Sequence, residues 1–195
     1  HGLGITPSMV FAKTRDQAAN WYVQFPGIMD GGRTLYLNAA DGDTQDVTWA
    51  TPAATSSVLK VNSQNVSGLS SPSDWVFYCW SEVPGFSSFG AYVGSGTTSG
   101  PFINTGFKPR WIMVKLAVGS IDDWFIIDTK RSPNNPAISA LSPNNTNAEQ
   151  SASYNSVNVT SNGFSPADSN QNFNGNGYTY IYAAFAETPT QFLPQ

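Results

Sequence analysis

The stretch WVFYCWSEVP, residues 75–84, returns near the end of the chain as YIYAAFAETP, residues 180–189, which is 105 positions later. Each is an aromatic and apolar run that closes with a Glu and, two residues later, a Pro. A strand that is apolar on both faces is typical of the centre of a sheet covered on both sides. The Pro removes a backbone donor where the ladder of hydrogen bonds should end. The repetition indicates that one structural unit occurs twice.

Earlier blocks of the chain repeat in the same order as this pair. The matched positions are Gly4 with Gly106, Pro7 with Pro109 and Lys13 with Lys115 at an offset of 102, Trp21-Tyr22 with Trp124-Phe125 at an offset of 103, and Leu35–Asn38 with the segment around Leu141. Loop insertions in a duplicated unit produce small offsets that grow along the chain in this way. The sequence therefore predicts an internal duplication, with repeat unit 1 at residues 1–86 and repeat unit 2 at residues 87–195.

Short β-rich runs bounded by turn residues recur along the chain, and no long stretch keeps its apolar residues at helical spacing. The runs follow one another at roughly 8 to 12 residues, which is the spacing of β-sandwiches and barrels. The pattern predicts an all-β fold of two tandem, pseudo-symmetric, sandwich-like units of jelly-roll or lectin-like type. In residues 9–13, MVFAK, and 111–115, WIMVK, the lysine after the apolar run is predicted to face solvent at a strand end.

The two units differ at their start. Unit 2 begins with SSFGAYVGSGTTSGPFI, residues 87–103, which predicts a strand, a Gly-Ser-Gly turn and a second short strand. Unit 1 starts at His1 without such a lead-in, so we expect a processed product or a piece of a longer polypeptide. The lead-in of unit 1 has been removed, belongs to another domain or comes from a neighbouring subunit. A sheet that lacks one strand presents an unpaired edge that invites the addition of a strand.

Composition and charge limit the function. The 195 residues carry a formal net charge of -4 and only nine scattered Lys and Arg residues, which argues against nucleic acid as a partner. No window of 18 apolar residues predicts a membrane span, and no charged and apolar leader predicts a signal peptide. Charged residues make up 11% and aromatic residues 13% of the chain, a balance typical of extracellular and virion-surface β proteins.

The chain offers little for nucleophilic or metal chemistry. Cys79, the only cysteine, lies in an apolar run, and the only histidine is His1, so Cys79 is predicted to be a small buried hydrophobic residue. Residues 41–46, DGDTQD, and 168–177, DSNQNFNGNG, resemble calcium loops only in their alternating Asp and Asn residues. Both are predicted to be loops in which these side chains bond the local backbone. No metal and no cofactor is predicted.

Carboxylates for a glycosidase are present but form no motif. The candidates are Asp122, Asp123, Asp128, Glu82 and Glu187. Glu82 and Glu187 occupy matched positions in the two units, which indicates an architectural role as strand-ending carboxylates that accept backbone hydrogen bonds. No serine-hydrolase, metalloprotease or phosphate-binding motif occurs. The sequence therefore predicts that the protein is not an enzyme and has no catalytic residues.

Two kinds of feature point to sugars. Four of the six tryptophans lie in the repeated strand blocks and are predicted to be core residues: Trp21, Trp75, Trp80 and Trp124. Trp49 and Trp111 are the freer candidates for stacking on a sugar ligand. Three sequons would carry glycans only in a chain secreted by a glycosylating cell, and they stand at Asn65, Asn144 and Asn158.

Nine motifs together support a family resemblance. They are, in order, HGLGITPSMVFAK, NWYVQF, TLYLN, SSVLKV, WVFYCWSEVPGFSSFGAYVGSG, TGFKPRWIMVK, DDWFIIDTKR, SNGF and GYTYIYAAFAETP. This set covers nearly the whole chain and resembles a bacteriophage virion domain of unknown function, which occurs in tail-fibre-like and other structural proteins of tailed phages. The resemblance implies a β-rich, non-enzymatic component of a phage particle, at the virion surface, with no catalytic residues to carry over.

We therefore expect a structural or adhesive component of a phage particle, a tail fibre or a surface decoration. Its expected partners are further copies of itself or other virion proteins. A lectin-like module that binds host surface glycans is a second expectation, and it requires a concave site lined by aromatic and Asn residues. A third is the subunit of an extracellular filament, in which a neighbour supplies the lead-in strand. A glycosidase built on Glu82 and Glu187 is a fourth.

Overall fold

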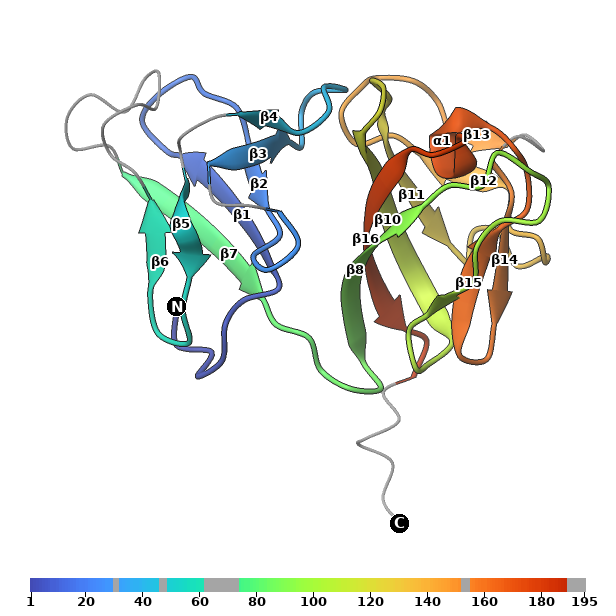
Figure 1. Ribbon diagram of the computed structural model, residues 1–195, viewed down its shortest axis with the longest axis horizontal. Helices are drawn as coiled ribbons and strands as arrows, with labels where there is room; N and C mark the ends of the chain where they lie inside the picture. The colour runs from blue at the N-terminus through green and yellow to red at the C-terminus, as the bar shows by residue number, and fades with distance from the viewer. Residues whose placement is uncertain (30–31, 46–48, 62–73, 152–154, 189–195) are drawn as a thin grey trace, which may run out of the picture. The chain divides into compact units, whose positions relative to one another are not determined.

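Figure 1 shows the computed structural model, which describes residues 1–29, 32–45, 49–61, 74–151 and 155–188. These residues form sixteen strands and one short helix, so the predicted all-β, sandwich-like fold is confirmed. The chain divides into two compact units, unit 1 from His1 to Glu82 and unit 2 from Val83 to Gln195. The boundary predicted between residues 86 and 87 lies four residues further along.

Unit 1 consists of one larger sheet and one hairpin. Its strands are β1 (Met9–Thr14), β2 (Tyr22–Gln24), β3 (Arg33–Tyr36), β4 (Thr44–Gln45), β5 (Trp49–Ala54), β6 (Leu59–Val61) and β7 (Trp75–Trp80). The sheet has the order β4-β3-β2-β1-β7 and is antiparallel throughout, while β5 and β6 pair with each other. Strand β7 therefore ends the larger sheet.

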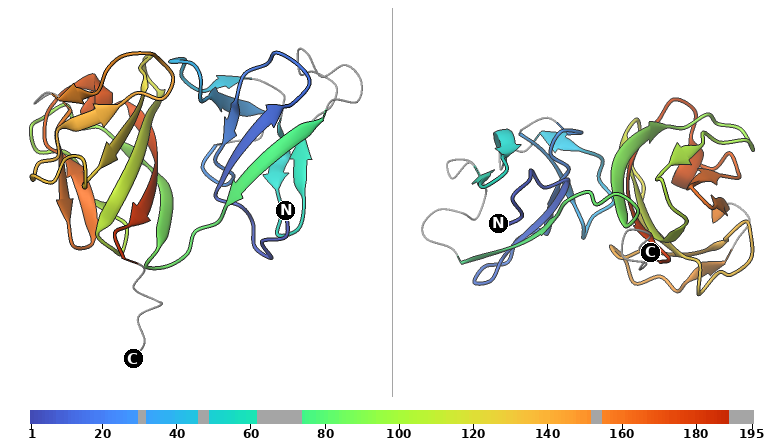
Figure 2. Two further views of the ribbon diagram at one scale, coloured as in Figure 1. Left: turned by 180° about the vertical axis from the view of Figure 1, so that it is seen from behind. Right: turned by 90° about the horizontal axis from the view of Figure 1, so that it is seen from below.

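Unit 2 repeats this plan and adds to it. Its strands are β8 (Ser87–Val93), β9 (Ile103–Asn104), β10 (Pro109–Val118), β11 (Trp124–Asp128), β12 (Ser139–Leu141), β13 (Gln150–Ser151), β14 (Val157–Thr160), β15 (Gly163–Pro166) and β16 (Thr179–Ala186). The larger sheet has the order β13-β12-β11-β10-β16-β8, and the smaller one β14-β15-β9. Helix α1 (Gln171–Asn174) is a single turn, capped by the side chain of Asn170. Figures 1 and 2 show β8, in green, beside β16, in red.

The two larger sheets share one strand order and one register. Strands β4, β3, β2, β1 and β7 correspond to β13, β12, β11, β10 and β16. Lys13 of β1 lies opposite Val76 of β7, and its counterpart Lys115 lies opposite Ile181. The matched blocks in the sequence therefore occupy matched places in the two sheets.

Hydrogen bonds outside the sheets repeat as well. The side-chain oxygen of Asn38 accepts from the backbone N–H of Trp21 at 2.8 Å, and that of Asn144 accepts from Trp124 at 2.9 Å. In the hairpin of unit 1, the hydroxyl of Thr55 donates to the carbonyl of Val58. In the hairpin of unit 2, the hydroxyl of Thr160 donates to the carbonyl of Gly163, the counterpart of Val58. Polar contacts of this kind depend on local backbone geometry, so their recurrence shows that the two units fold alike in their loops too.

The lysines of the repeated blocks do not face solvent, and that prediction is wrong. Lys115 is fully buried, and its ammonium donates to the carbonyl oxygens of Leu116 at 2.8 Å and Asp122 at 2.9 Å. Lys13 is partly buried and donates to the carbonyl oxygen of Thr14 at 2.9 Å. Strand β10 runs on past Lys115, which keeps the side chain inside, and the carbonyl oxygens offset the cost of desolvating the charge.

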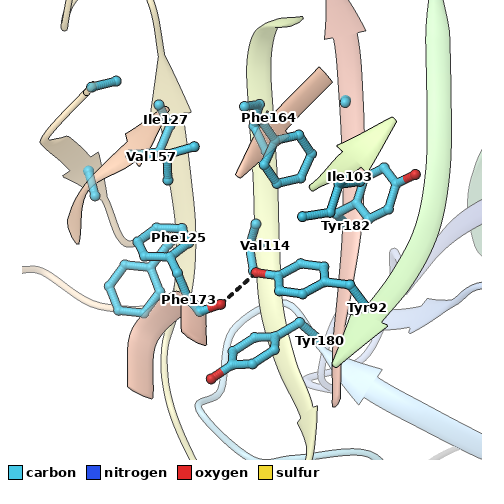
Figure 3. Close-up of a cluster of buried hydrophobic side chains, with 14 of the residues drawn as sticks. Tyr92, Ile103, Val114, Phe125, Ile127, Val157, Phe164, Phe173, Tyr180 and Tyr182 are labelled. Atoms are coloured by element: carbon cyan, nitrogen blue, oxygen red, sulfur yellow. Dashed lines mark hydrogen bonds between the residues drawn. The ribbon is translucent and has the colours of Figure 1, made fainter. Parts of the chain in front are cut away.

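Unit 2 has an apolar core between its two sheets. Side chains of its two sheets meet in one cluster, in which Phe125, Phe164, Phe173, Tyr180 and Ile127 are buried (Figure 3). From the lead-in, Tyr92 of β8 and Ile103 of β9 complete this cluster. One core cluster of unit 1 contains Val10, Ala12, Tyr22, Trp49 and Ala53. The described part of unit 1 contains no counterpart of β8, the strand that brings Tyr92 to the cluster of unit 2.

Candidate functional site

Strand β7 is the most unusual surface element of unit 1. Its sequence, WVFYCW, carries no charge, and among the described residues nothing pairs with its outer edge. Edge strands in soluble proteins are usually protected by Lys, Pro or a bulge, because an open ladder attracts further strands. The counterpart of β7 in unit 2, β16, has β8 along this same edge. The predicted unpaired edge of unit 1 is therefore the edge of β7.

The register shows which backbone groups lie on the open edge. Arg15 donates its N–H to the carbonyl of Asp74 at 2.8 Å, which marks these two residues as a hydrogen-bonded pair of the antiparallel ladder. Such pairs alternate along a strand, so every second residue of β7 directs its N–H and C=O away from β1. These residues are Trp75, Phe77 and Cys79, and their counterparts in unit 2 lie opposite Tyr92, Gly90 and Ser88 of β8.

The inner face of β7 is incompletely covered. Trp75, Phe77 and Cys79 pack against the core of unit 1 but stay only partly buried. Their counterparts in unit 2 are Tyr180, Tyr182 and Ala184, which are 0%, 6% and 0% exposed. The same three positions are thus sealed where an extra strand lies beside them and accessible where none does.

A cavity of about 340 Å³ opens at this inner face. It is lined by His1, Leu59, Phe77 and Cys79. The ring of His1 lies 3.0 Å from the carbonyl oxygen of Thr55, at the tip of the β5-β6 hairpin. In unit 2 the counterpart of Leu59 is Phe164 of β15, which is fully buried and has β9 as its neighbouring strand. The cavity is therefore a consequence of the thinner cover on unit 1.

Cys79 is a half-buried thiol without signs of activation. The prediction of a buried residue is corrected, because Cys79 lines the cavity and is only partly covered. Burial raises the pKa of its thiol, although the positive N-terminus acts in the opposite direction. A raised pKa keeps the thiol protonated at neutral pH, whereas nucleophilic cysteines need a lowered one. Cys79 therefore serves better as a marker of this surface than as a nucleophile.

The outer face of β7 carries a row of aromatic rings. Trp80 meets Phe11 edge-on at 5.0 Å between ring centroids, and Tyr78 stacks on Trp80 and on Trp21, at 6.3 Å in each case. Tyr78 is 46% exposed, and the other three rings are partly buried. The counterpart of Tyr78 in unit 2 is the fully buried Ala183. An exposed ring at this position therefore occurs in unit 1 and not in unit 2.

The predicted sugar contacts take different places. Trp49 is 2% exposed, and its ring N–H donates to the hydroxyl of Thr34 at 3.2 Å, so it belongs to the core of unit 1 and not to the free surface. Trp111 is partly buried on the outer face of unit 2, with its ring 5.6 Å from that of Phe185. Of the four tryptophans predicted to be core residues, only Trp124 is fully buried. The prediction of which tryptophans of unit 1 are accessible is therefore wrong.

The acidic residues considered for catalysis are engaged separately. The carboxylate of Asp123 accepts from the side chains of Asn144 and Asn145 at 2.6 and 2.7 Å. Burial raises the pKa of Asp122, whereas for Asp128 burial is outweighed by hydrogen bonds from the N–H of Lys130 and from Arg110, which lower its pKa. A hydrogen bond from Lys108, at 2.9 Å, lowers the pKa of Glu187. Glu187 thus forms an ion pair, and the predicted acceptance of backbone bonds by its carboxylate is not what the structure shows.

The two calcium-like segments differ in how much of them is described. Asp168 accepts from the N–H of Asn170 at 2.8 Å, and Asn170 accepts from the N–H of Asn172 at 3.0 Å, which confirms the predicted local backbone bonding in residues 168–177. In residues 41–46, Asp43 pairs with Arg33, and position 46 lies outside the described residues. No group of three or more His, Cys, Asp or Glu side chains gathers within the described ranges.

Of the sequons, Asn65 lies outside the described residues. Asn144 uses both ends of its side chain, since its oxygen accepts from Trp124 and its Nδ2 donates to Asp123, so a glycan on Nδ2 would compete with the contact to Asp123. The third, Asn158, lies on β14. Within the part of the chain that the structure describes, no helix is long and apolar enough to cross a membrane.

Comparison with known proteins places the chain by family alone. No curated protein and no solved structure matches it significantly. The model of a domain of unknown function, DUF7483, matches residues 1–189, which span unit 1 and all the described strands of unit 2. Because this match extends over nearly the whole chain, the protein belongs to the DUF7483 family of domains of unknown function.

Proposed function

We propose that the chain is a non-enzymatic structural component of a bacteriophage particle, at the virion surface, and that it joins its neighbours through β7. The ordered motifs of the sequence support the phage context. The observation that carries the joining role is an uncharged, aromatic strand at the edge of a sheet, with both of its faces partly accessible. Aromatic side chains are enriched at protein interfaces, and open strand edges add affinity through backbone hydrogen bonds.

The proposal is tested on purified phage particles from the source organism. We expect mass spectrometry to detect the chain in particles that have been separated from free protein on a density gradient. We also expect Cys79, the single cysteine of the chain, to be alkylated in the isolated protein and protected in the intact particle. Particles that lack the chain would overturn the phage role, and equal reactivity of Cys79 in both states would overturn the role of β7.

The aromatic row on the outer face favours a second function, the binding of a host glycan. Phe11, Trp21, Tyr78 and Trp80 offer partly accessible ring faces, and such faces stack on the apolar faces of sugars. The partly exposed polar surface of a weakly charged chain would supply hydrogen bonds. This adhesive role is compatible with a place on the virion surface.

The glycan function is tested on a broad glycan panel. We expect any glycan that binds to lose affinity by about fivefold in the variant Tyr78→Ala, since one aromatic contact contributes about 1 kcal/mol. The matched control is Trp111→Ala, which removes a partly buried aromatic ring from the outer face of unit 2. Binding lost in the control and kept in Tyr78→Ala would move the site to Trp111. A panel without any binding would remove this second function.

A further inference from the structure

We infer that the open edge of β7 accepts an antiparallel strand from another protein of the particle, and that this strand has the chemistry of residues 86–94, FSSFGAYVG. This inference rests on the joining role proposed for β7 and names its partner. The occupant is an extended, uncharged segment with a glycine opposite Phe77 and a large aromatic residue opposite Trp75. Unit 2 provides the template, since its own β8 occupies the equivalent edge.

The template fits because the two edges share their backbone pattern. At the ends of the β8-β16 pair, Gly94 donates to the carbonyl of Tyr178 at 2.9 Å and Ala186 donates to the carbonyl of Phe86 at 2.8 Å. This places Tyr180, Tyr182 and Ala184 in hydrogen-bonded positions toward β8. Their counterparts in β7 are the three residues whose N–H and C=O lie on the open edge. A strand added to β7 therefore finds the same sequence of donors and acceptors.

The template also defines which side chains the edge tolerates. Gly90 lies opposite Tyr182, and a Cβ on Gly90 would be only 2.7 Å from the ring of Tyr182. Tyr92 stacks on Tyr180 at 5.0 Å, with 13° between the ring planes. Because Phe77 and Trp75 replace these two tyrosines in unit 1, the same order of glycine and aromatic residue suits β7. The aromatic residue would also cover the open inner face and its cavity.

The lead-in of unit 2 is not reproduced as a whole. In unit 2, β9 pairs with β15 across Gly163, where a Cβ would lie 2.1 Å from the carbonyl oxygen of Ile103. The counterpart of Gly163 in the hairpin of unit 1 is Val58, which is 51% exposed and already carries a side chain. A copy of β9 therefore cannot approach β6 in the same way. The acceptor site is limited to the edge of β7.

The same steric rule argues against two molecules of this chain pairing through β7 itself. In a symmetric pair centred on the strand, the open-edge residues would face one another, and Phe77 would meet Trp75, Phe77 or Cys79 of the second molecule. None of these is a glycine. The pairing that the template supports therefore brings a different segment to β7, with a small residue at its centre.

The experiment uses the full chain and a synthetic peptide with the sequence FSSFGAYVG. Alkylation of Cys79 by an uncharged thiol reagent, at about pH 8.5 so that a thiol of raised pKa still reacts, is followed by mass spectrometry. We expect the rate to fall by about tenfold when the peptide exceeds its Kd about tenfold, because Cys79 then becomes as covered as Ala184. We expect hydrogen exchange to slow in residues 75–80 and not in β8.

Three matched peptides decide between the outcomes. Gly90→Val in the peptide should abolish protection, as should N-methylation at Tyr92, whereas N-methylation at Ala91 should leave it intact because that amide faces away from β7. No protection by the parent peptide, or equal protection by all peptides, overturns the inference. Protection that rises with protein concentration alone identifies a second molecule as the occupant and overturns it as well. If the peptide fails while Cys79 is protected in particles, the inference falls and the proposed function stands. If the peptide protects Cys79 and the particle does not, the joining role of β7 falls, and the inference falls with it because no protein of the particle then covers this edge.

Discussion

Replacing Lys115 by methionine is expected to lower the free energy of unfolding of unit 2 by about 3 kcal/mol. Methionine keeps the length of the apolar stem and removes the ammonium, so the carbonyl oxygen of Leu116, which is buried, and that of Asp122, which is partly buried, lose a charged donor. Each buried acceptor left without a partner costs about 1 to 3 kcal/mol. Because Lys115 is fully buried, water cannot replace the ammonium without opening the turn.

Unfolding in guanidinium chloride, followed by tryptophan fluorescence, measures the effect, and hydrogen exchange in β10 and β16 assigns it to unit 2. The matched control is Lys13→Met, at the same place in unit 1. Lys13 is only partly buried and donates to Thr14 and Gln17, so water can take its place and the expected loss is about 1 kcal/mol. A loss in Lys115→Met no larger than that in the control would contradict a structural role for the buried ammonium.

Replacing Gly163 by alanine is the second large change, with an expected loss of about 2 to 3 kcal/mol in unit 2. The new methyl group would lie 2.1 Å from the carbonyl oxygen of Ile103 and 2.8 Å from the ring of Phe102. The first of these atoms belongs to the backbone of β9, so the clash is relieved only if β9 moves away from β15. That movement exposes Ile103 and Phe164, which are 6% and 0% exposed.

Thermal unfolding measures this loss, and faster hydrogen exchange in residues 103–104 and 163–166 locates it. Val58→Ala, at the counterpart position of unit 1, is the control. Val58 is 51% exposed, so trimming it should change stability by less than about 0.5 kcal/mol. If Gly163→Ala is as stable as the parent and its exchange is unchanged, β9 does not press on β15 as the structure shows.

The repeated blocks were sufficient to predict the fold class and which strands of the two units match. Trp75 to Trp80 and Tyr180 to Phe185 lie in the same register against β1 and β10, because strand pairing follows the alternation of side chains that the sequence displays. The burial of Lys115 could not be predicted in this way. Its partners are carbonyl oxygens of the following residues, and a pattern of side chains contains no information on where such oxygens point.

For the candidate site, the open edge could be predicted from the sequence, but the exposure of its aromatic residues could not. An unpaired edge in unit 1 was predicted, and among the described residues the structure identifies it as the edge of β7. The same duplication misled the interpretation of Trp21, Trp75 and Trp80, since residues in matched strands were expected to be equally buried. Burial depends on the neighbouring strand as well as on the residue itself, and in the described part of unit 1 that neighbour is not present. The aromatic row around Tyr78 follows from this difference.

The sheet of unit 2 has β8 along one edge, whereas in the described part of unit 1 the corresponding edge of β7 is open, so the two units have different roles in assembly. Unit 2 supplies the strand β8 to its own sheet, whereas the edge of β7 in unit 1 accepts a strand from another protein. A contact at β7 therefore joins two unlike surfaces and is heterologous. If the donor protein also carries a receptive edge of its own, each addition creates the site for the next and the assembly grows in one direction. If it carries none, growth stops after a single step, and the number of copies in the assembly is then set by the donor and not by this chain.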